Sequence, residues 1–145
     1  MRRERAYFDT SVLVKRYFLE PGSSEARKLF RVYKPVSSQI ALIESVSAVQ
    51  RRRDAGHLRE RDFKAILSAI RQDRKTWELI EVTAEVVAKA EELIPQIHIR
   101  TLDAIHVASA VLYQNRLGRR LPFVTGDEPQ RRAAGGLMGE VIWVG

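Results

Sequence analysis

Four acidic residues from widely separated parts of the chain have the types and positions that chemistry would need: Asp9, Glu44, Asp103 and Asp127. Asp103 opens a stretch, residues 102–112, that is apolar on every side when read as a helix, which is the pattern of a buried helix. A carboxylate directed into an apolar interior needs a partner, because an isolated buried charge costs too much free energy. The other three acids suggest that this partner is a metal ion.

The physical argument for a metal rests on charge repulsion. If the four carboxylates meet, one pair at ~4 Å costs on the order of 4 kcal/mol at an effective dielectric constant of about 20. A divalent cation removes that cost. The chain has no cysteine, which excludes disulfides and thiolate ligands or nucleophiles. Oxygen ligands favour a hard ion such as Mg²⁺ or Mn²⁺, which lowers the pKa of a bound water so that the water attacks a phosphodiester in line.

Each acid also has a structural explanation. Asp9 and Asp127 suit the N-cap of a helix, and Asp103 in a first helical turn would interact with the helix dipole. Glu44 would be a solvated helix residue, although its row on the helix, with Ile40 and Ala48, is otherwise non-polar. The four acids together favour a metal site more than any one of them does.

Four further polar residues lie near these acids in the sequence. His106 is interpreted as a hydrogen-bonded core histidine that supports the site rather than as a metal ligand. Thr10, Ser11 and Thr125 either orient carboxylates and waters or serve only as turn and cap residues.

The elements that must position these residues alternate between strands and helices. Strands are expected at residues 5–8, 35–38, 79–82, 121–125 and 140–144. Helices are expected after residues 9–11 as far as Pro21-Gly22, from a cap at Ser23 or Ser24 to 33, and over 39–53, 59–77, 83–95, 101–118 and 129–134. Trp77 is placed on the apolar stripe of the fourth helix, Pro95 closes the fifth, and Thr101 caps the sixth. This alternation predicts an α/β domain with a mainly parallel sheet.

Ligands of open parallel sheets bind beyond the carboxyl ends of the strands. Asp9 directly follows the first expected strand, and Asp127 lies two residues past the fourth. Glu44 lies on the helix after the second strand, and Asp103 opens the central helix. The topology therefore predicts that four separate segments bring their acids to one edge of the sheet.

Length and composition set the broad class. The 145 residues, 45% hydrophobic and 30% charged, fit a single globular domain over 1–145. No apolar run approaches the roughly 20 residues that cross a bilayer, so no membrane partner is expected. The basic start, Met1-Arg2-Arg3-Glu4-Arg5, is not followed by the apolar run of a signal peptide. A cytoplasmic protein is expected.

The net charge of +7 is concentrated in one region. Residues 51–75 hold nine Lys or Arg against four acids. A basic surface often indicates a polyanionic partner such as RNA or DNA. A merely soluble surface explains the same charge equally well.

Taken in order, four segments of this chain resemble the PIN domain: Asp9-Thr10-Ser11-Val12-Leu13-Val14-Lys15, Glu44 in an early helix, residues 100–110 (RTLDAIHVASA), and Phe123-Val124-Thr125-Gly126-Asp127. More closely, the chain is similar to the VapC-type toxin ribonucleases of type II toxin–antitoxin pairs. The first and third segments are quite specific, whereas the lone Glu and the Thr-x-Asp are weak individually.

The resemblance implies a PIN-like three-layer α/β/α sandwich with a mainly parallel sheet of four to five strands. It implies an endoribonuclease, dependent on Mg²⁺ or Mn²⁺, that cleaves RNA. Asp9, Glu44, Asp103 and Asp127 would be the catalytic, metal-binding residues, and Thr10 or Thr125 would support them by hydrogen bonding. A homodimer is implied, together with a cognate antitoxin whose tail enters the active-site groove.

One departure follows Asp127, where family members often carry a basic and then an apolar residue. Here Glu128-Pro129-Gln130 follows, so Glu128 is either a fifth acid of the site or the sign of a different helix start.

Three alternatives to the ribonuclease were weighed. One is a non-catalytic PIN-like module that binds RNA or a protein through the basic helices. A receiver-type phosphoacceptor domain is set aside, because Val82-Thr83-Ala84 stands where its acceptor Asp would follow the third strand. Cleavage of DNA is chemically possible, because a metal site that attacks phosphate does not by itself read the sugar.

Overall fold

Five parallel strands form a single sheet in the order β3-β2-β1-β4-β5 in a computed structural model that describes residues 2–145. The strands are β1 (Glu4–Phe8), β2 (Tyr33–Ser38), β3 (Glu78–Ile80), β4 (Pro122–Thr125) and β5 (Glu140–Trp143). Each neighbouring pair is parallel, so the prediction of a parallel sheet of four to five strands is confirmed. Residue 1 of the expected domain lies outside the described residues.

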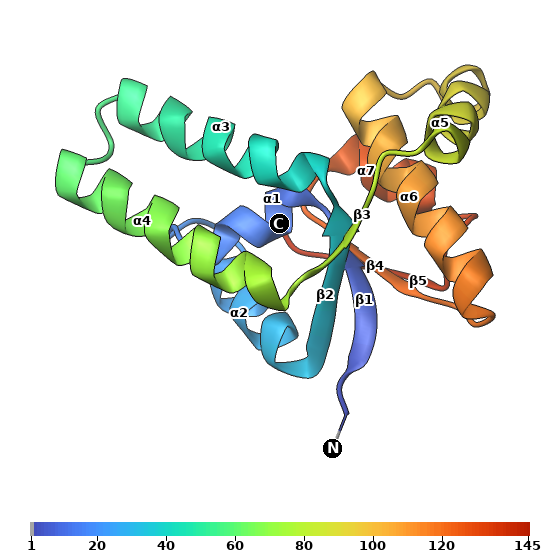
Figure 1. Ribbon diagram of the computed structural model, residues 1–145, viewed down its shortest axis with the longest axis horizontal. Coiled ribbons are helices and arrows are strands. Elements are labelled where there is room, and N and C mark those ends of the chain that lie inside the picture. Colours follow the sequence, from blue (N-terminus) through green and yellow to red (C-terminus); the bar gives the residue numbers. More distant parts are fainter. Residues whose placement is uncertain (1) are drawn as a thin grey trace.

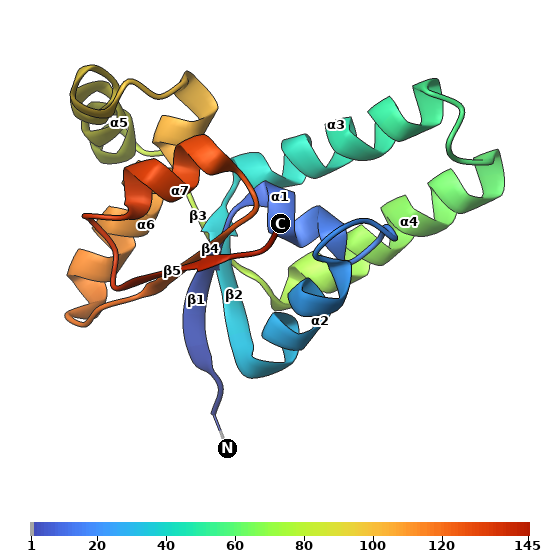
Figure 2. The same ribbon diagram turned by 180° about the vertical axis from the view of Figure 1, so that it is seen from behind.

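Helices cover both faces of this sheet, as the two opposite views in Figures 1 and 2 show. On one face lie α1 (Thr10–Lys15), α2 (Ser23–Val32), α3 (Ile40–Asp54) and α4 (Glu60–Asp73), the last extended by the short 3₁₀ turn η1 (Arg74–Thr76). On the other lie α5 (Ala84–Ile97), α6 (Thr101–Leu117) and α7 (Glu128–Ala134). The predicted α/β/α sandwich is therefore confirmed, and α3 and α4 extend together beyond the sheet as an arm (Figure 1).

The central strand β1 divides the core in two, because successive side chains of a strand point to opposite faces. Tyr7 packs among residues of α5, α6 and α7, whereas Ala6 and Phe8 pack among residues of α1, α2 and α4. The expected burial of α6 is confirmed: Ala104 and residues 106–111 are all buried. The sheet and α6 thus form a rigid base for the side chains at the carboxyl edge of the sheet.

Two predictions around the fourth and fifth helices are wrong. Trp77 does not belong to the helix expected over 59–77, because η1 tightens its last turn and Trp77 adopts an extended backbone that leads into β3. Pro95 does not close the fifth helix. Contacts of Leu93, Ile94 and Ile97 with the core sustain α5 for another two residues, and tertiary packing of this kind outweighs local propensity.

Two N-caps and one boundary also differ. Gly22, with φ at 88°, precedes α2 in place of a serine cap, and Arg100 precedes α6 in place of Thr101. Tyr33 leaves the preceding helix because it pairs with Glu4 of β1. Asp103 nevertheless lies in the first turn of α6, as predicted.

Across residues 2–145, no helix combines the length and the apolar character that spanning a membrane requires.

Candidate active site

All four acids singled out in the sequence line one pocket of about 320 Å³ at the carboxyl edge of the sheet. Asp9 follows β1, Glu44 lies on α3, Asp103 opens α6 and Asp127 precedes α7. The remaining walls come from α1, α3, α6 and α7: Thr10, Ser11, Val14, Ser47, Ala48, Arg51, Leu102 and Gln130. The prediction that separate segments bring these residues together is confirmed.

Asp9 lies at the bottom of the pocket and is fully buried. Its Oδ1 accepts hydrogen bonds from the Ser11 hydroxyl at 2.6 Å and from the Val12 amide at 3.3 Å. Its Oδ2 accepts one from the Thr125 hydroxyl at 2.7 Å. The residue therefore caps α1 and also lines the pocket, so its structural role does not exclude the functional one.

The pKa of Asp9 is raised to about 6, mainly because burial disfavours the charged carboxylate. The charge of His106 and the hydrogen bonds from Ser11, Thr125 and Val12 act in the opposite direction. Hydrogen bonds from the protein thus compensate the lost solvation of Asp9 only in part. A cation in the pocket would supply the rest.

Glu44 is held by two donors. The Thr10 hydroxyl donates to its Oε1 at 2.6 Å, and the His106 Nε2 lies 2.7 Å from the same atom. Burial alone raises the pKa of Glu44, but the hydrogen bond and charge of His106, and then Thr10 and Arg51, outweigh burial and lower the pKa below its usual value. Glu44 is therefore ionised at neutral pH, and it is not the freely solvated residue that the sequence left open.

His106 connects Glu44 to the core. It is buried, and its Nδ1 lies 2.7 Å from the Tyr7 hydroxyl. A carboxylate only accepts hydrogen bonds, so Nε2 donates to Glu44, while Nδ1 and the Tyr7 hydroxyl form the second hydrogen bond of the ring. Burial raises the pKa of Tyr7 well above its usual value, which keeps that proton in place. The interpretation of His106 as a supporting core residue is confirmed.

Asp103 and Asp127 both line the pocket and lie close enough to interact electrostatically. Burial and then the negative charge of Asp127 raise the pKa of Asp103. The Gln130 amide donates to Asp103 at 2.9 Å, while the backbone amide of Gln130 is capped by Asp127 at 3.1 Å. One residue of α7 therefore orients both acids.

Glu128 does not join this group. It is exposed and lies 3.4 Å from Arg131 on the outer side of α7. The departure after Asp127 therefore reflects how α7 starts, with Asp127 as its N-cap and Pro129 in its first turn.

The donor set fits a hard cation held by few protein ligands. Four carboxylates supply oxygen ligands, and the repulsion between Asp103 and Asp127 is the kind that a cation relieves. Within residues 2–145, however, no three acidic, histidine or cysteine side chains are grouped closely enough to hold an ion by themselves. Mg²⁺ usually takes one or two carboxylates and completes its shell with water and substrate phosphate, so such an ion would need only some of the four acids.

Two supporting residues, Tyr7 and Gln130, were missed in the sequence. A tyrosine in a buried strand needs a partner for its hydroxyl, and this requirement was a usable signal for Tyr7. The contact of Gln130 with Asp103 joins residues 27 positions apart, and no local pattern indicates it.

Comparisons with known proteins agree with this geometry. The family model described as PIN domain matches residues 6–136. Ribonuclease VapC46 of Mycobacterium tuberculosis (strain ATCC 25618 / H37Rv) is 34% identical over 129 residues, which cover 88% of each chain.

Two solved structures share the fold. VapBC2 from Rickettsia felis, bound to a DNA fragment from their promoter, has a TM-score of 0.65 at 17% identity and covers 94% of this chain and 98% of that one. A toxin–antitoxin complex from Klebsiella pneumoniae has a TM-score of 0.61 at 18% identity and covers 84% and 86%.

Proposed function

Because the chain belongs to the PIN domain family, we propose that it is a metal-dependent endoribonuclease and the toxin of a toxin–antitoxin pair. The resemblance that its motifs indicated is confirmed by the family match and by the 34% identical relative named as a ribonuclease. The observation that carries the proposal is the convergence of Asp9, Glu44, Asp103 and Asp127 on one pocket.

In this proposal, Mg²⁺ or Mn²⁺ would be held chiefly by Asp9 and Asp103, with Glu44 and Asp127 completing the acidic site. The chemistry that such an ion supplies when bound is activation of a water for in-line attack on the phosphodiester and stabilisation of the leaving oxygen. Ser11 and Thr125 fix the rotamer of Asp9, Gln130 fixes Asp103, and His106 with Thr10 fixes Glu44. Arg51, on the wall of the same pocket, is placed to attract the phosphate backbone of RNA.

The product ends test this proposal. Because the attacking group is water and not the ribose 2′-hydroxyl, cleavage of a mixed RNA pool is expected to leave no 2′,3′-cyclic phosphate. A substrate with a single 2′-deoxyribose at the mapped cleavage site should still be cut. Mass spectrometry of the products, with the RNA sequence and Mg²⁺ held constant, measures both. Cyclic phosphate ends, or resistance of the deoxy substrate, would contradict the proposed nucleophile and would also reveal a contaminating ribonuclease.

The same family membership leads us to propose two protein partners, a cognate antitoxin and a second copy of this chain. Apolar side chains that remain exposed on α3 and α6 support the pairing: Ile43 is 75% exposed, Val46 44% and Leu102 48%. Light scattering of the chain, alone and mixed with the product of the adjacent reading frame, measures both associations. A mass equal to one chain in each case would contradict them.

A further inference from the structure

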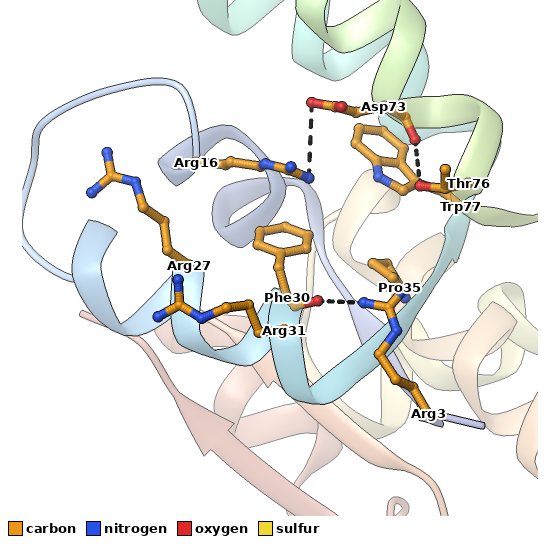
Figure 3. A pocket seen from close by; sticks show the side chains of 9 residues that line it. All are labelled: Arg3, Arg16, Arg27, Phe30, Arg31, Pro35, Asp73, Thr76 and Trp77. Carbon is orange, nitrogen blue, oxygen red and sulfur yellow. Dashed lines mark hydrogen bonds and ion pairs between the residues drawn. The ribbon is translucent and has the colours of Figure 1, made fainter. Parts of the chain in front are cut away.

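A second cavity, of about 640 Å³, lies on the face of the sheet covered by α1, α2 and α4 (Figure 3). We call it the arginine pocket, since four arginines line it: Arg3, Arg16, Arg27 and Arg31. It shares no lining residue with the acidic pocket. Arg3 precedes β1 at the amino edge of the sheet, opposite the edge that holds Asp9.

The positive charge of the arginine pocket is not balanced by the protein. Asp73 is the single acid in its lining, and it already accepts the Tyr17 hydroxyl at 2.6 Å and lies 3.8 Å from Arg16. Within the described residues 2–145, no carboxylate lies within ion-pair distance of Arg3, Arg27 or Arg31. Arg27 and Arg31 are one helical turn apart on α2, a spacing at which like charges repel. An anion of more than one charge would relieve this repulsion.

Two of the arginines are held in place before any ligand arrives. The Arg16 guanidinium lies over the Phe30 ring, 5.2 Å from its centroid, and is fixed on its other side by Asp73. Arg3 donates to the Phe30 backbone carbonyl at 2.6 Å. Ordering these side chains in advance lowers the entropy that a ligand would otherwise lose on binding.

An unused donor marks the same cavity. Trp77 is 6% exposed, and its indole Nε1 is buried without a hydrogen-bond partner among residues 2–145. Figure 3 shows this nitrogen on the side of the ring that faces Arg16 and Phe30. Because this nitrogen is covered by protein atoms, the indole is a buried part of the cavity wall that can report on binding next to it.

We propose that the arginine pocket binds a phosphomonoester, either a mononucleotide or the 5′-phosphate end of an RNA strand. Such a group carries about −1.5 to −2 charges at neutral pH and three acceptor oxygens. It therefore suits a cavity whose lining carries four arginines and a single acid. A carboxylate of an acidic peptide or an internal phosphodiester brings one charge and two free oxygens. The cavity volume lies within the range of small-molecule sites.

The indole signal of Trp77 tests this site without depending on RNA cleavage. The chain has two tryptophans, so the variant Trp143→Phe assigns their two indole N–H signals in a ¹H–¹⁵N spectrum. With EDTA present, the full-length chain is titrated with inorganic phosphate, adenosine 5′-monophosphate and short RNAs of one sequence with a 5′-phosphate or a 5′-hydroxyl. The Trp77 signal is expected to shift and saturate with each phosphomonoester, and RNA with a 5′-hydroxyl should bind at least about tenfold more weakly.

A matched pair of variants assigns the binding to these residues. The double variant Arg27→Gln, Arg31→Gln should weaken phosphomonoester binding at least about tenfold, since it removes charge-assisted hydrogen bonds. The control Arg61→Gln, Lys64→Gln removes the same charge from the early part of α4, about 15 Å along that helix from Asp73, and should bind as the wild type does.

Comparison of the titrated ligands distinguishes the two possible sources of the phosphate group. Tighter binding of the phosphorylated RNA than of the mononucleotide would assign the site to an RNA end, and equal binding would assign it to free nucleotide. Equal binding of both RNAs would overturn the proposal in favour of general charge attraction. A shift produced by a polyglutamate peptide and not by phosphate would overturn it in favour of an acidic protein. Because EDTA blocks metal-dependent cleavage, these outcomes do not depend on whether the chain is a ribonuclease.

Discussion

Replacing Asp9 by Asn is expected to abolish RNA cleavage and, at neutral pH, to leave the chain at least as stable as the wild type. Loss of the negative charge removes several kcal/mol of metal-dependent stabilisation of the transition state, which corresponds to a rate at least about 10²-fold lower. The fold should survive, because Asn Oδ1 can still accept from Ser11 and Val12 while its amide donates to the Thr125 hydroxyl.

The expected stability of the Asp9→Asn variant follows from the pKa of Asp9. Its value rises from 3.8 to about 6 in the folded chain, so between these pH values the folded state binds more protons than the unfolded state. The free energy of unfolding contributed by Asp9 therefore falls as pH rises through this window, by roughly 3 kcal/mol in all. Asp9→Asn should lose this pH dependence and recover part of that energy at neutral pH.

Urea unfolding between about pH 4 and about pH 8 measures the difference, with cleavage assayed on the same preparations. Asp54→Asn serves as the control, because Asp54 is an exposed acid at the far end of α3. That control should keep wild-type cleavage and wild-type pH dependence. If Asp9→Asn instead unfolds the chain at neutral pH, Asp9 is a structural cap and the catalytic assignment is wrong.

Withdrawing divalent cations is the second change with a large expected effect: EDTA should stop cleavage, and added Mg²⁺ or Mn²⁺ should restore it. The physical reason is that the negative charge of Asp127 raises the pKa of Asp103, and a bound cation would offset the repulsion between the two acids. Calorimetric titration of Mn²⁺ into the wild type and into Asp103→Asn measures binding separately from activity. The variant should bind Mn²⁺ more weakly by about tenfold or more, since it loses one charged ligand.

The same titration separates the two functional hypotheses. RNA binding that persists in EDTA, together with no Mn²⁺ binding and no cleavage under any condition, would support the non-catalytic module. The absence of a preformed three-ligand cluster in residues 2–145 is the observation that keeps that hypothesis in view. Cleavage that continues at full rate in EDTA would contradict both.

The strand–helix alternation was enough to predict the sheet and the edge at which the acids meet. Asp9 directly follows β1 and Asp127 lies two residues past β4, so their placement needed little more than the rule for parallel sheets. Asp103 was equally accessible, because the apolar run after it could only be a buried helix. The segments that failed were those in which contacts distant in sequence decide the local backbone, such as Trp77 entering β3 and Pro95 within α5.

The arginine pocket shows the limit of sequence reasoning most clearly. Its arginines come from the segment before β1, from the residue after α1 and from α2, and no spacing in the sequence relates Arg3 and Arg16 to the pair on α2. Residues 51–75 have the higher density of basic residues along the chain. The density of basic residues along the sequence does not show which basic side chains lack a neighbouring carboxylate in the folded protein. Only the three-dimensional structure shows this.

Because Asp9 is buried, its carboxylate lowers the stability of the folded chain at neutral pH while it serves the proposed activity. A laboratory screen that rewarded only survival at high temperature would enrich neutral replacements at residue 9, and the selected chains would be robust and inert. Engineering a more stable form of this fold should therefore begin on α4, which contributes no residue to the acidic pocket.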